Sequence, residues 1–175
     1  MQILIRDIHK ELGIPENYGT SPTMPVFDEP ESLVSVGPNI IGKEQQLTPQ
    51  TAHAWKAMSN AAGGDGIALL IVSGFRGITY QAELFKKKLA AGQTIEEILC
   101  VNAAPGFSQH HTGRAIDIAT PDSRPLTLEF ESTPAFSWLT ENAGKFGFKM
   151  PYEADNRWGI DYEPWHWFFS EDDQS

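Results

Sequence analysis

The chain lacks the signatures of disulfide-stabilised and membrane-spanning proteins. It has one cysteine, Cys100, so no internal disulfide can form, which is compatible with a reducing compartment. No apolar run approaches the roughly 20 residues that cross a bilayer. The first residues, MQILIRDIH, lack the basic region, the long apolar stretch and the cleavage site of a secretory signal. We therefore expect a cytoplasmic protein without a membrane anchor.

Positive charge is also scarce. Thirteen basic side chains stand against twenty-three acidic ones, which gives a formal net charge of −10. Such an acidic chain has little attraction for phosphate backbones or anionic lipid, so we expect neither nucleic acid nor membrane as a partner. The sequence contains no internal repeat and no low-complexity block. Its 175 residues, 41% of them hydrophobic, suffice for one domain with a sizeable core, and we expect a monomer.

The front of the chain differs from the rest in its pattern. Apolar residues from Ile3 to Leu12 repeat at helical spacing, and Gly13 followed by Pro15 predicts the end of a short helix. Residues 17–46 are rich in proline, glycine and polar residues and show no sustained periodicity. They are either an ordered wrap over the core or a flexible arm. We expect residues 1–47 to form this wrap or arm, and residues 48–175 the main part of a single compact domain.

The remainder has clear boundaries between predicted elements. We expect helices beginning after Thr48, at about residue 79, after Thr94 and after Thr133, and strands over residues 67–72, 114–119 and 162–169. These helices and strands do not alternate regularly, as they would in a parallel sheet built from βαβ units. The predicted class is therefore α+β, with a small, mainly antiparallel sheet and flanking helices.

Four side chains in two short segments carry the chemistry. His110 and Asp117 lie in SQHHTGRAID (residues 108–117), and Glu163 and His166 lie in EPWH (residues 163–166). Imidazole nitrogen and carboxylate oxygen are good zinc ligands, and three protein ligands leave a fourth position open to water, as a hydrolytic centre requires.

The two carboxylates have different surroundings. Asp117 lies in a predicted strand of otherwise small and apolar residues, where an unpaired carboxylate is costly. It therefore needs a metal, a cation or several hydrogen-bond donors. Glu163 lies among aromatic residues, and apolar rings should raise its pKa into the range of a general base or acid. The alternative for Glu163 is an ion pair with an arginine such as Arg157.

Spacing alone does not complete the ligand set. Either His110 or His111 can face Asp117, because the Thr-Gly pair after them can break the register of a straight strand. Glu163 and His166 are an odd number of residues apart, so they converge only if the backbone turns near Pro164.

A resemblance to a known family removes this ambiguity. The segments that carry it are SGFR at 73–76, YQ at 80–81, SQHHTGRAID at 108–117, WL at 138–139 with GF at 147–148, and EPWHW at 163–167. In this order they resemble the zinc D-alanyl-D-alanine carboxypeptidase family, which includes VanY and the related L,D-carboxypeptidases. The resemblance spans roughly residues 48 to 169 and implies a D,D-peptidase/hedgehog-like zinc fold.

The resemblance assigns roles residue by residue. It implies one zinc ion bound by His110, Asp117 and His166, with Glu163 as the catalytic base. It leaves His111 beside the ligands or at the rim of the site.

The same resemblance points to the residues that bind substrate. It places Arg76 where it can hold the substrate's terminal carboxylate or share the charge of the oxyanion. Gln81 and Ser108 would be neutral donors that orient the substrate, or else ordinary capping and turn residues. Phe75 stands where relatives usually have tyrosine, which puts the contribution of that hydroxyl in doubt here.

The implied substrate is a peptidoglycan-derived peptide or muropeptide that ends in D-alanine. Without a visible secretory signal, we favour an L,D-carboxypeptidase that trims tetrapeptides during cytoplasmic peptidoglycan recycling. The alternatives are a D,D-carboxypeptidase acting on D-Ala-D-Ala ends, a phage-type peptidoglycan endopeptidase and a binding module without activity. The presence of Glu163 argues against the last, because a structural zinc needs no base.

Overall fold

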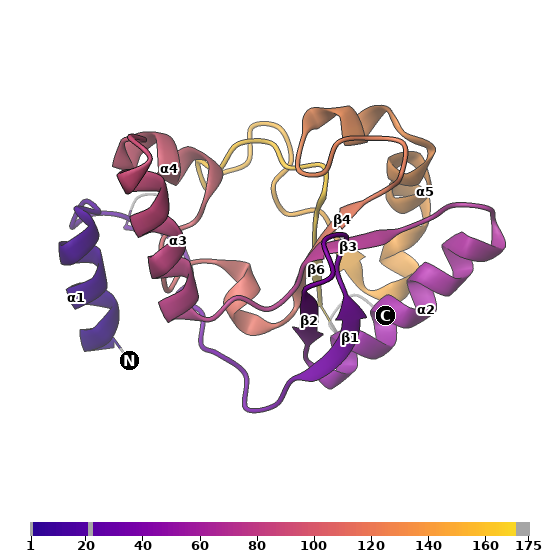
Figure 1. Cartoon of the computed structure of the whole chain (residues 1–175), viewed down its shortest axis with the longest axis horizontal. Coiled ribbons are helices and arrows are strands. Elements are labelled where there is room, and N and C mark those ends of the chain that lie inside the picture. The colour runs from indigo at the N-terminus through magenta and orange to yellow at the C-terminus, as the bar shows by residue number, and fades with distance from the viewer. Residues whose placement is uncertain (1, 21–22, 171–175) are drawn as a thin grey trace.

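The computed structural model describes residues 2–20 and 23–170, and at its centre lies a four-stranded antiparallel sheet (Figure 1). The strand order is β3-β4-β6-β5. The strands are β3 (Leu70–Ser73), β4 (Ala115–Ala119), β5 (Phe148–Lys149) and β6 (His166–Phe169). The prediction of a small antiparallel sheet within an α+β fold is confirmed.

The described residues form five α-helices, and three of them begin at the predicted caps. The helices are α1 (Gln2–Leu12), α2 (Pro49–Gly64), α3 (Ile78–Ala90), α4 (Ile95–Val101) and α5 (Pro134–Asn142). Thr48 caps α2 and Thr133 caps α5, while Thr94 and Glu97 form a complete capping box on α4. None of the described helices is long and apolar enough to cross a bilayer.

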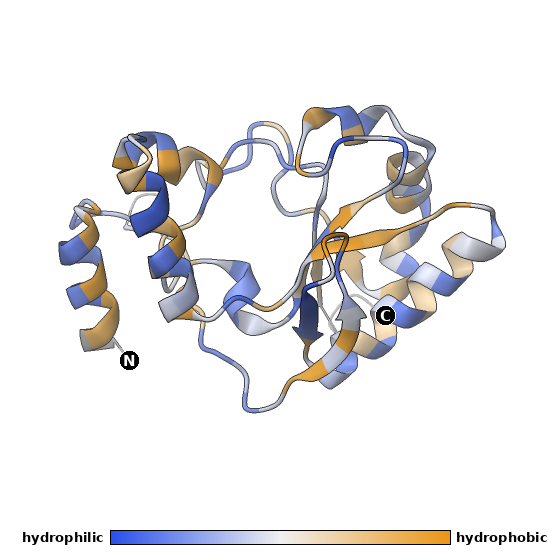
Figure 2. Cartoon of the chain, in the orientation of Figure 1, coloured by the Kyte–Doolittle hydropathy of each residue, from blue (hydrophilic) through white to orange (hydrophobic). Residues whose placement is uncertain are grey.

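The buried apolar side chains gather in two main clusters. The larger cluster joins the sheet to α2 and α5, and Figure 2 shows β3 and β4 as strongly hydrophobic ribbon at the centre of the molecule. The second cluster joins α1, α3 and α4, with Leu12, Phe85 and Ile98 buried together. The N-terminal helix thus contributes to a core of its own with α3 and α4 (Figure 1).

The front of the chain contains a hairpin that the sequence pattern did not predict. Strands β1 (Val34–Pro38) and β2 (Glu44–Leu47) pair antiparallel at the end of the front segment, where no strand was predicted. The strands are short, and the register shifts between Ser35 and Gly37, which erases the alternation that marks a strand. Asn39 ties the hairpin to β3, because its side-chain amide donates to the carbonyl of Val72 at 2.8 Å.

Candidate metal centre

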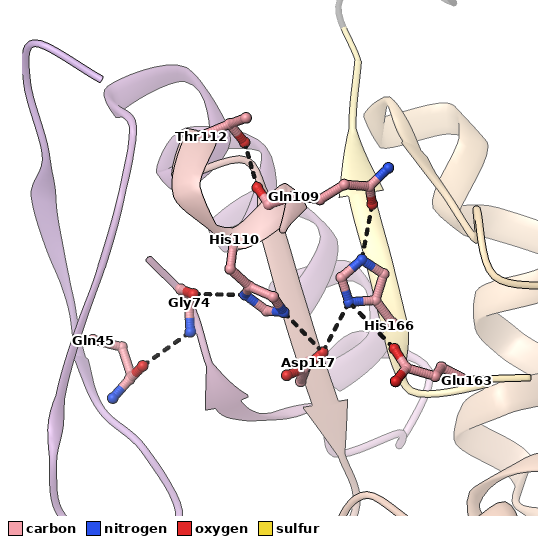
Figure 3. Close-up of polar contacts among 8 residues, drawn as sticks. All are labelled: Gln45, Gly74, Gln109, His110, Thr112, Asp117, Glu163 and His166. Carbon is pink, nitrogen blue, oxygen red and sulfur yellow. Dashed lines mark hydrogen bonds and ion pairs between the residues drawn. The ribbon is translucent and has the colours of Figure 1, made fainter. Parts of the chain in front are cut away.

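Two neighbouring strands bring Asp117 and His166 together. Asp117 of β4 and His166 of β6 are register partners in the antiparallel pair, so their side chains lie side by side on the sheet. The Nδ1 atom of His166 lies 3.0 Å from Oδ1 of Asp117 (Figure 3). On the other side of β4, Asp117 also pairs with Ser73 of β3, so strand pairing holds the position of Asp117 from both sides.

A short 3₁₀ helix supplies the third side chain. Element η1 (Gln109–Thr112) ends at Gly113, whose φ of 65° is left-handed. A Cβ atom at Gly113 would approach Leu33 Cδ2 to 2.9 Å, so both conformation and space require glycine. This turn directs His110 toward Asp117, with Nε2 and Oδ1 3.3 Å apart. The structure therefore brings His110, and not His111, to the other two candidates.

The three ligand atoms form a buried group of the size that one metal ion requires. They all lie within 4.8 Å of one another, and all three side chains are buried. Within the described residues, Nε2 of His110 has no hydrogen-bond partner. Its other ring nitrogen, Nδ1, donates to the carbonyl of Gly74 at 2.7 Å, which leaves the Nε2 lone pair facing the group. A buried, unsatisfied nitrogen beside an aspartate fits a divalent cation such as zinc.

The protonation states also suit a metal. Burial, reinforced by the nearby Arg76 guanidinium, lowers the pKa of His110 to about 4. Burial alone would raise the pKa of Asp117, but His110 and His166 outweigh it and hold that pKa well below its ordinary value. Near neutral pH the pair is therefore a neutral imidazole and a carboxylate, which are the forms that bind zinc.

Glu163 approaches the group because the backbone turns at Pro164. The amide of His166 donates to the carbonyl of Glu163 at 3.1 Å, which closes the turn. One carboxylate oxygen of Glu163 then lies 3.9 Å from Nδ1 of His166. Burial, followed by the negative charge of Asp117, raises the pKa of Glu163 to about 8, although Arg76 opposes the rise. Arg157, the alternative partner, lies instead over the ring of Trp158 at 4.0 Å.

A small cavity opens beside these residues. Its volume of about 20 Å³ is enough for one water molecule. The residues that line it are Arg76, Val101, Asn102, Ala103, Ser108, His110, Tyr152, Ile160, Glu163 and His166. The buried Nε of Arg76 has no hydrogen-bond partner in the described part of the chain, so it remains available to a ligand. Arg76 and Ser108 thus line the same cavity as His110 and His166.

Tyr152, for which no role was predicted from the sequence, forms one side of this cavity. Its ring centroid lies 4.7 Å from that of His166, and the side chain is buried. Burial, followed by the negative charge of Glu163, raises the pKa of its hydroxyl far above the ordinary value. Tyr152 precedes an irregular stretch without sequence periodicity, so no pattern marked it.

Gln81 and His111 do not line the cavity, but each is hydrogen-bonded to the backbone of a residue that does. The Gln81 amide donates to the carbonyl of Ala103 at 2.9 Å. Nδ1 of His111 donates to the carbonyl of Arg76 at 2.6 Å, and Nε2 accepts from the amide of Gly106 at 3.0 Å. His111 is fully buried, so it does not lie at the rim. It links the backbone of Arg76 to the loop that carries Ala103.

The chain is similar in sequence and structure to known carboxypeptidases. The family model described as VanY, D-alanyl-D-alanine carboxypeptidase, matches residues 44–172. A Bacillus subtilis protein named as a candidate carboxypeptidase, YodJ, is 30% identical over 166 residues, which are 91% of this chain and 57% of that protein. The chain spans between 39% and 65% of the length of the curated relatives it matches.

Two solved structures share the fold. The LdcB LD-carboxypeptidase is 30% identical with a TM-score of 0.72, and the match covers 83% of this chain and 71% of that one. A vancomycin-resistance D,D-pentapeptidase, VanY, in complex with Zn(II) is 26% identical with a TM-score of 0.60, over 79% of this chain and 78% of that one. The zinc in that neighbour agrees with the His110, Asp117 and His166 group found here.

Proposed function

Because this chain belongs to the VanY D-alanyl-D-alanine carboxypeptidase family, we propose that it is a zinc carboxypeptidase that removes the C-terminal D-alanine from peptidoglycan stem peptides. The observation that carries the proposal is that Glu163 and Arg76 line one small cavity together with His110 and His166, the two histidines of the His110, Asp117 and His166 group. A structural metal site needs neither a base nor a partner for a substrate carboxylate.

His110, Asp117 and His166 would hold the ion. When bound, zinc supplies a Lewis acid that polarises the scissile carbonyl and makes a water molecule more acidic. Glu163, which is near the ligands and partly buried, accepts the proton of the attacking water and returns it to the leaving amine. Its carboxylate must be ionised to begin this cycle, and a nearby cation favours that form.

Arg76 would bind the free carboxylate of the substrate. Its guanidinium presents planar donors that match a carboxylate, and its Nε is buried without a partner among the described residues. A carboxylate bound there would place the last peptide bond next to the metal group and Glu163. Ser108 lines the same cavity and would donate to the substrate backbone. The requirement for a C-terminal carboxylate distinguishes a carboxypeptidase from an endopeptidase.

We further propose that the favoured substrate is a tetrapeptide, cleaved by L,D-carboxypeptidase activity in peptidoglycan recycling. The higher structural similarity to the LD-carboxypeptidase LdcB than to VanY supports this preference. Recycling takes place where muropeptides are recovered, so the proposal includes a cytoplasmic location. The exposed thiol of Cys100 is stable in a reducing compartment.

Mass spectrometry of the products tests both levels of the proposal. Purified, zinc-loaded protein is incubated with a muramyl tetrapeptide, a muramyl pentapeptide and intact sacculi, with and without a chelator. We expect chelator-sensitive release of D-alanine, faster from the tetrapeptide. A faster reaction on the pentapeptide would make the enzyme a D,D-carboxypeptidase, and loss of cross-links from sacculi would make it an endopeptidase. Cell fractionation tests the location separately.

A Glu163→Gln variant separates an enzyme from a binding module. The variant keeps the size of the side chain but removes its capacity to accept a proton. We expect zinc to remain bound and hydrolysis to be lost. If the wild-type protein binds zinc and the peptide but releases no D-alanine from any of the three substrates, the carboxypeptidase assignment fails.

A further inference from the structure

Gln109 contacts His166, although no role was predicted for it from the sequence. It is the first residue of η1, directly before His110, and its side chain reaches β6. Its Oε1 atom lies 2.9 Å from Nε2 of His166 (Figure 3). The Thr112 hydroxyl donates to the Gln109 backbone carbonyl at 2.7 Å, which braces the turn that carries the amide. His166 is therefore held on both ring nitrogens, by Asp117 at Nδ1 and by Gln109 at Nε2.

The tautomer of His166 depends on this contact. A neutral imidazole carries one N–H, and the nitrogen that binds a metal must be the one without it. Nδ1 of His166 faces the metal group, so the hydrogen must sit on Nε2 and needs an acceptor there. The carbonyl oxygen of the Gln109 amide is that acceptor. Without an ion, Asp117 attracts the hydrogen to Nδ1, and Gln109 can then turn its NH₂ group toward Nε2.

The other histidine ligand is supported differently. Nδ1 of His110 donates to the backbone carbonyl of Gly74, which can only accept, so its tautomer is the same with or without an ion. Gln109 is an amide side chain that can either accept or donate. The two ligands therefore differ in how firmly the protein selects their metal-binding form.

We propose that Gln109 is a positioning residue that orients His166 and selects its metal-binding tautomer. Groups that hydrogen-bond the outer nitrogen of a histidine ligand affect metal affinity about 10- to 100-fold. The proposal rests on the metal site of the proposed function but not on the identity of the substrate. It is tested by zinc affinity, which does not require a turnover assay.

Three variants separate orientation from packing. Gln109→Met keeps approximately the same volume and removes strong hydrogen bonding. Gln109→Glu keeps an acceptor for the Nε2 hydrogen and removes the donor. Gln93→Met is the matched control, because Gln93 is exposed after the end of α3 and does not line the cavity.

Zinc affinity is measured by competition with a chromophoric chelator, and the melting temperature of the metal-free protein reports whether each variant folds. We expect Gln109→Met to weaken zinc binding about 10- to 100-fold, with Gln109→Glu at wild-type affinity or tighter and Gln93→Met unchanged. Wild-type affinity in a folded Gln109→Met variant would overturn the proposal. Equal loss in the Met and Glu variants would also overturn it, because packing would then explain both.

The two proposals can fail separately. If no peptide ending in D-alanine is cleaved but the zinc affinities follow the expected order, the proposed activity falls and the role of Gln109 stands. If peptides are cleaved and Gln109→Met binds zinc like the wild type, the activity stands and the role of Gln109 falls. Nitrogen NMR of the His166 ring provides a direct readout, because zinc-loaded wild-type protein should carry its hydrogen on Nε2.

Discussion

Two sides of the cavity are built in different ways. The ligand wall, as we call η1 and β6 together with the neighbouring strand β4, holds the three proposed metal ligands by strand pairing and one tight turn, and it lies within the family match. The roof loop, residues 103–107, begins at the cavity and is held by side chains and backbone from the first 27 residues, which lie outside that match. The chemistry is therefore local to the sheet, whereas the enclosure depends on distant parts of the chain.

Three contacts from the N-terminal segment fix the roof loop. Nε2 of His9 donates to the carbonyl of Pro105 at 2.8 Å, across 96 residues of sequence. The Tyr18 hydroxyl accepts from the amide of Ala104 at 3.3 Å, and the amide of Phe27 donates to the carbonyl of Gly106 at 2.8 Å. Glycine is required at Gly106, because its φ is 91° and a Cβ atom would approach Ile5 to 2.7 Å. Damage to these contacts should alter substrate binding and spare the metal.

The largest effect is expected from a change in the ligand wall that leaves the roof loop intact. Glu163→Gln should lower kcat by about 10²- to 10⁴-fold, the usual contribution of a general acid–base group, while zinc affinity changes little. Steady-state kinetics with the tetrapeptide and a chelator titration measure the two quantities. Glu153→Gln, at an exposed position, is the control. Full activity in Glu163→Gln would remove this residue from the mechanism.

The second largest effect is expected from the loss of metal binding, which concerns the ligand wall and not the roof loop. At a free zinc concentration one hundred times the dissociation constant, binding adds about 2.7 kcal/mol to the free energy of unfolding. We expect Asp117→Asn to lose most of this increment, because it removes the charged ligand between His110 and His166. Denaturant unfolding with and without zinc measures it. An equal zinc increment in wild type and variant would place the metal elsewhere.

A smaller effect should follow from the roof loop alone. Tyr18→Phe removes the acceptor for the Ala104 amide and costs about 1 kcal/mol of local stability, the typical value of one hydrogen bond. Amide hydrogen exchange within residues 103–107 should become faster, and KM should rise by up to about fivefold, the equivalent of that energy. Zinc affinity should not change. A comparable loss of zinc binding would show that the two sides are not independent. Tyr80→Phe, whose hydroxyl contacts Lys43, is the control.

The smallest effect is a pH dependence carried by His9. Burial lowers the pKa of His9 below its ordinary 6.5, although its hydrogen bond to Pro105 opposes the shift. The unfolded chain therefore binds a proton more readily than the folded protein, and stability falls as the pH drops below about 6.5. His9→Gln should reduce this slope in denaturant unfolding between pH 5 and 7. An unchanged slope would mean that other histidines carry it.

The sequence was most informative where structure is determined by neighbouring residues. Thr48, Thr94 and Thr133 marked three helix starts correctly because a cap acts within a few residues. The alternating strand ending at Ala119 was also found, with its start one residue later than predicted. The strand predicted over 162–169 covers only His166–Phe169, because residues 163–166 form the turn that aims Glu163.

The candidate site was predictable only in part. Residue chemistry pointed to Asp117, Glu163 and histidine, but the choice of His110 needed the family resemblance, since a 3₁₀ turn breaks the spacing that would decide it. Gln109 reaches His166 across 57 residues of sequence and Tyr152 reaches it from an irregular segment, so no local pattern encodes either contact. The hairpin at Val34–Leu47 escaped detection for a related reason, because its anchor is on β3.

The register between β4 and β6 gives the sheet a second task. Asp117 and His166 are 49 residues apart in sequence and become neighbours only when these two strands pair. A slip of one residue would turn His166 to the opposite face and leave the centre one ligand short. Correct pairing of these strands is therefore a condition for metal binding. An ion can be bound tightly only by a chain that has already folded correctly.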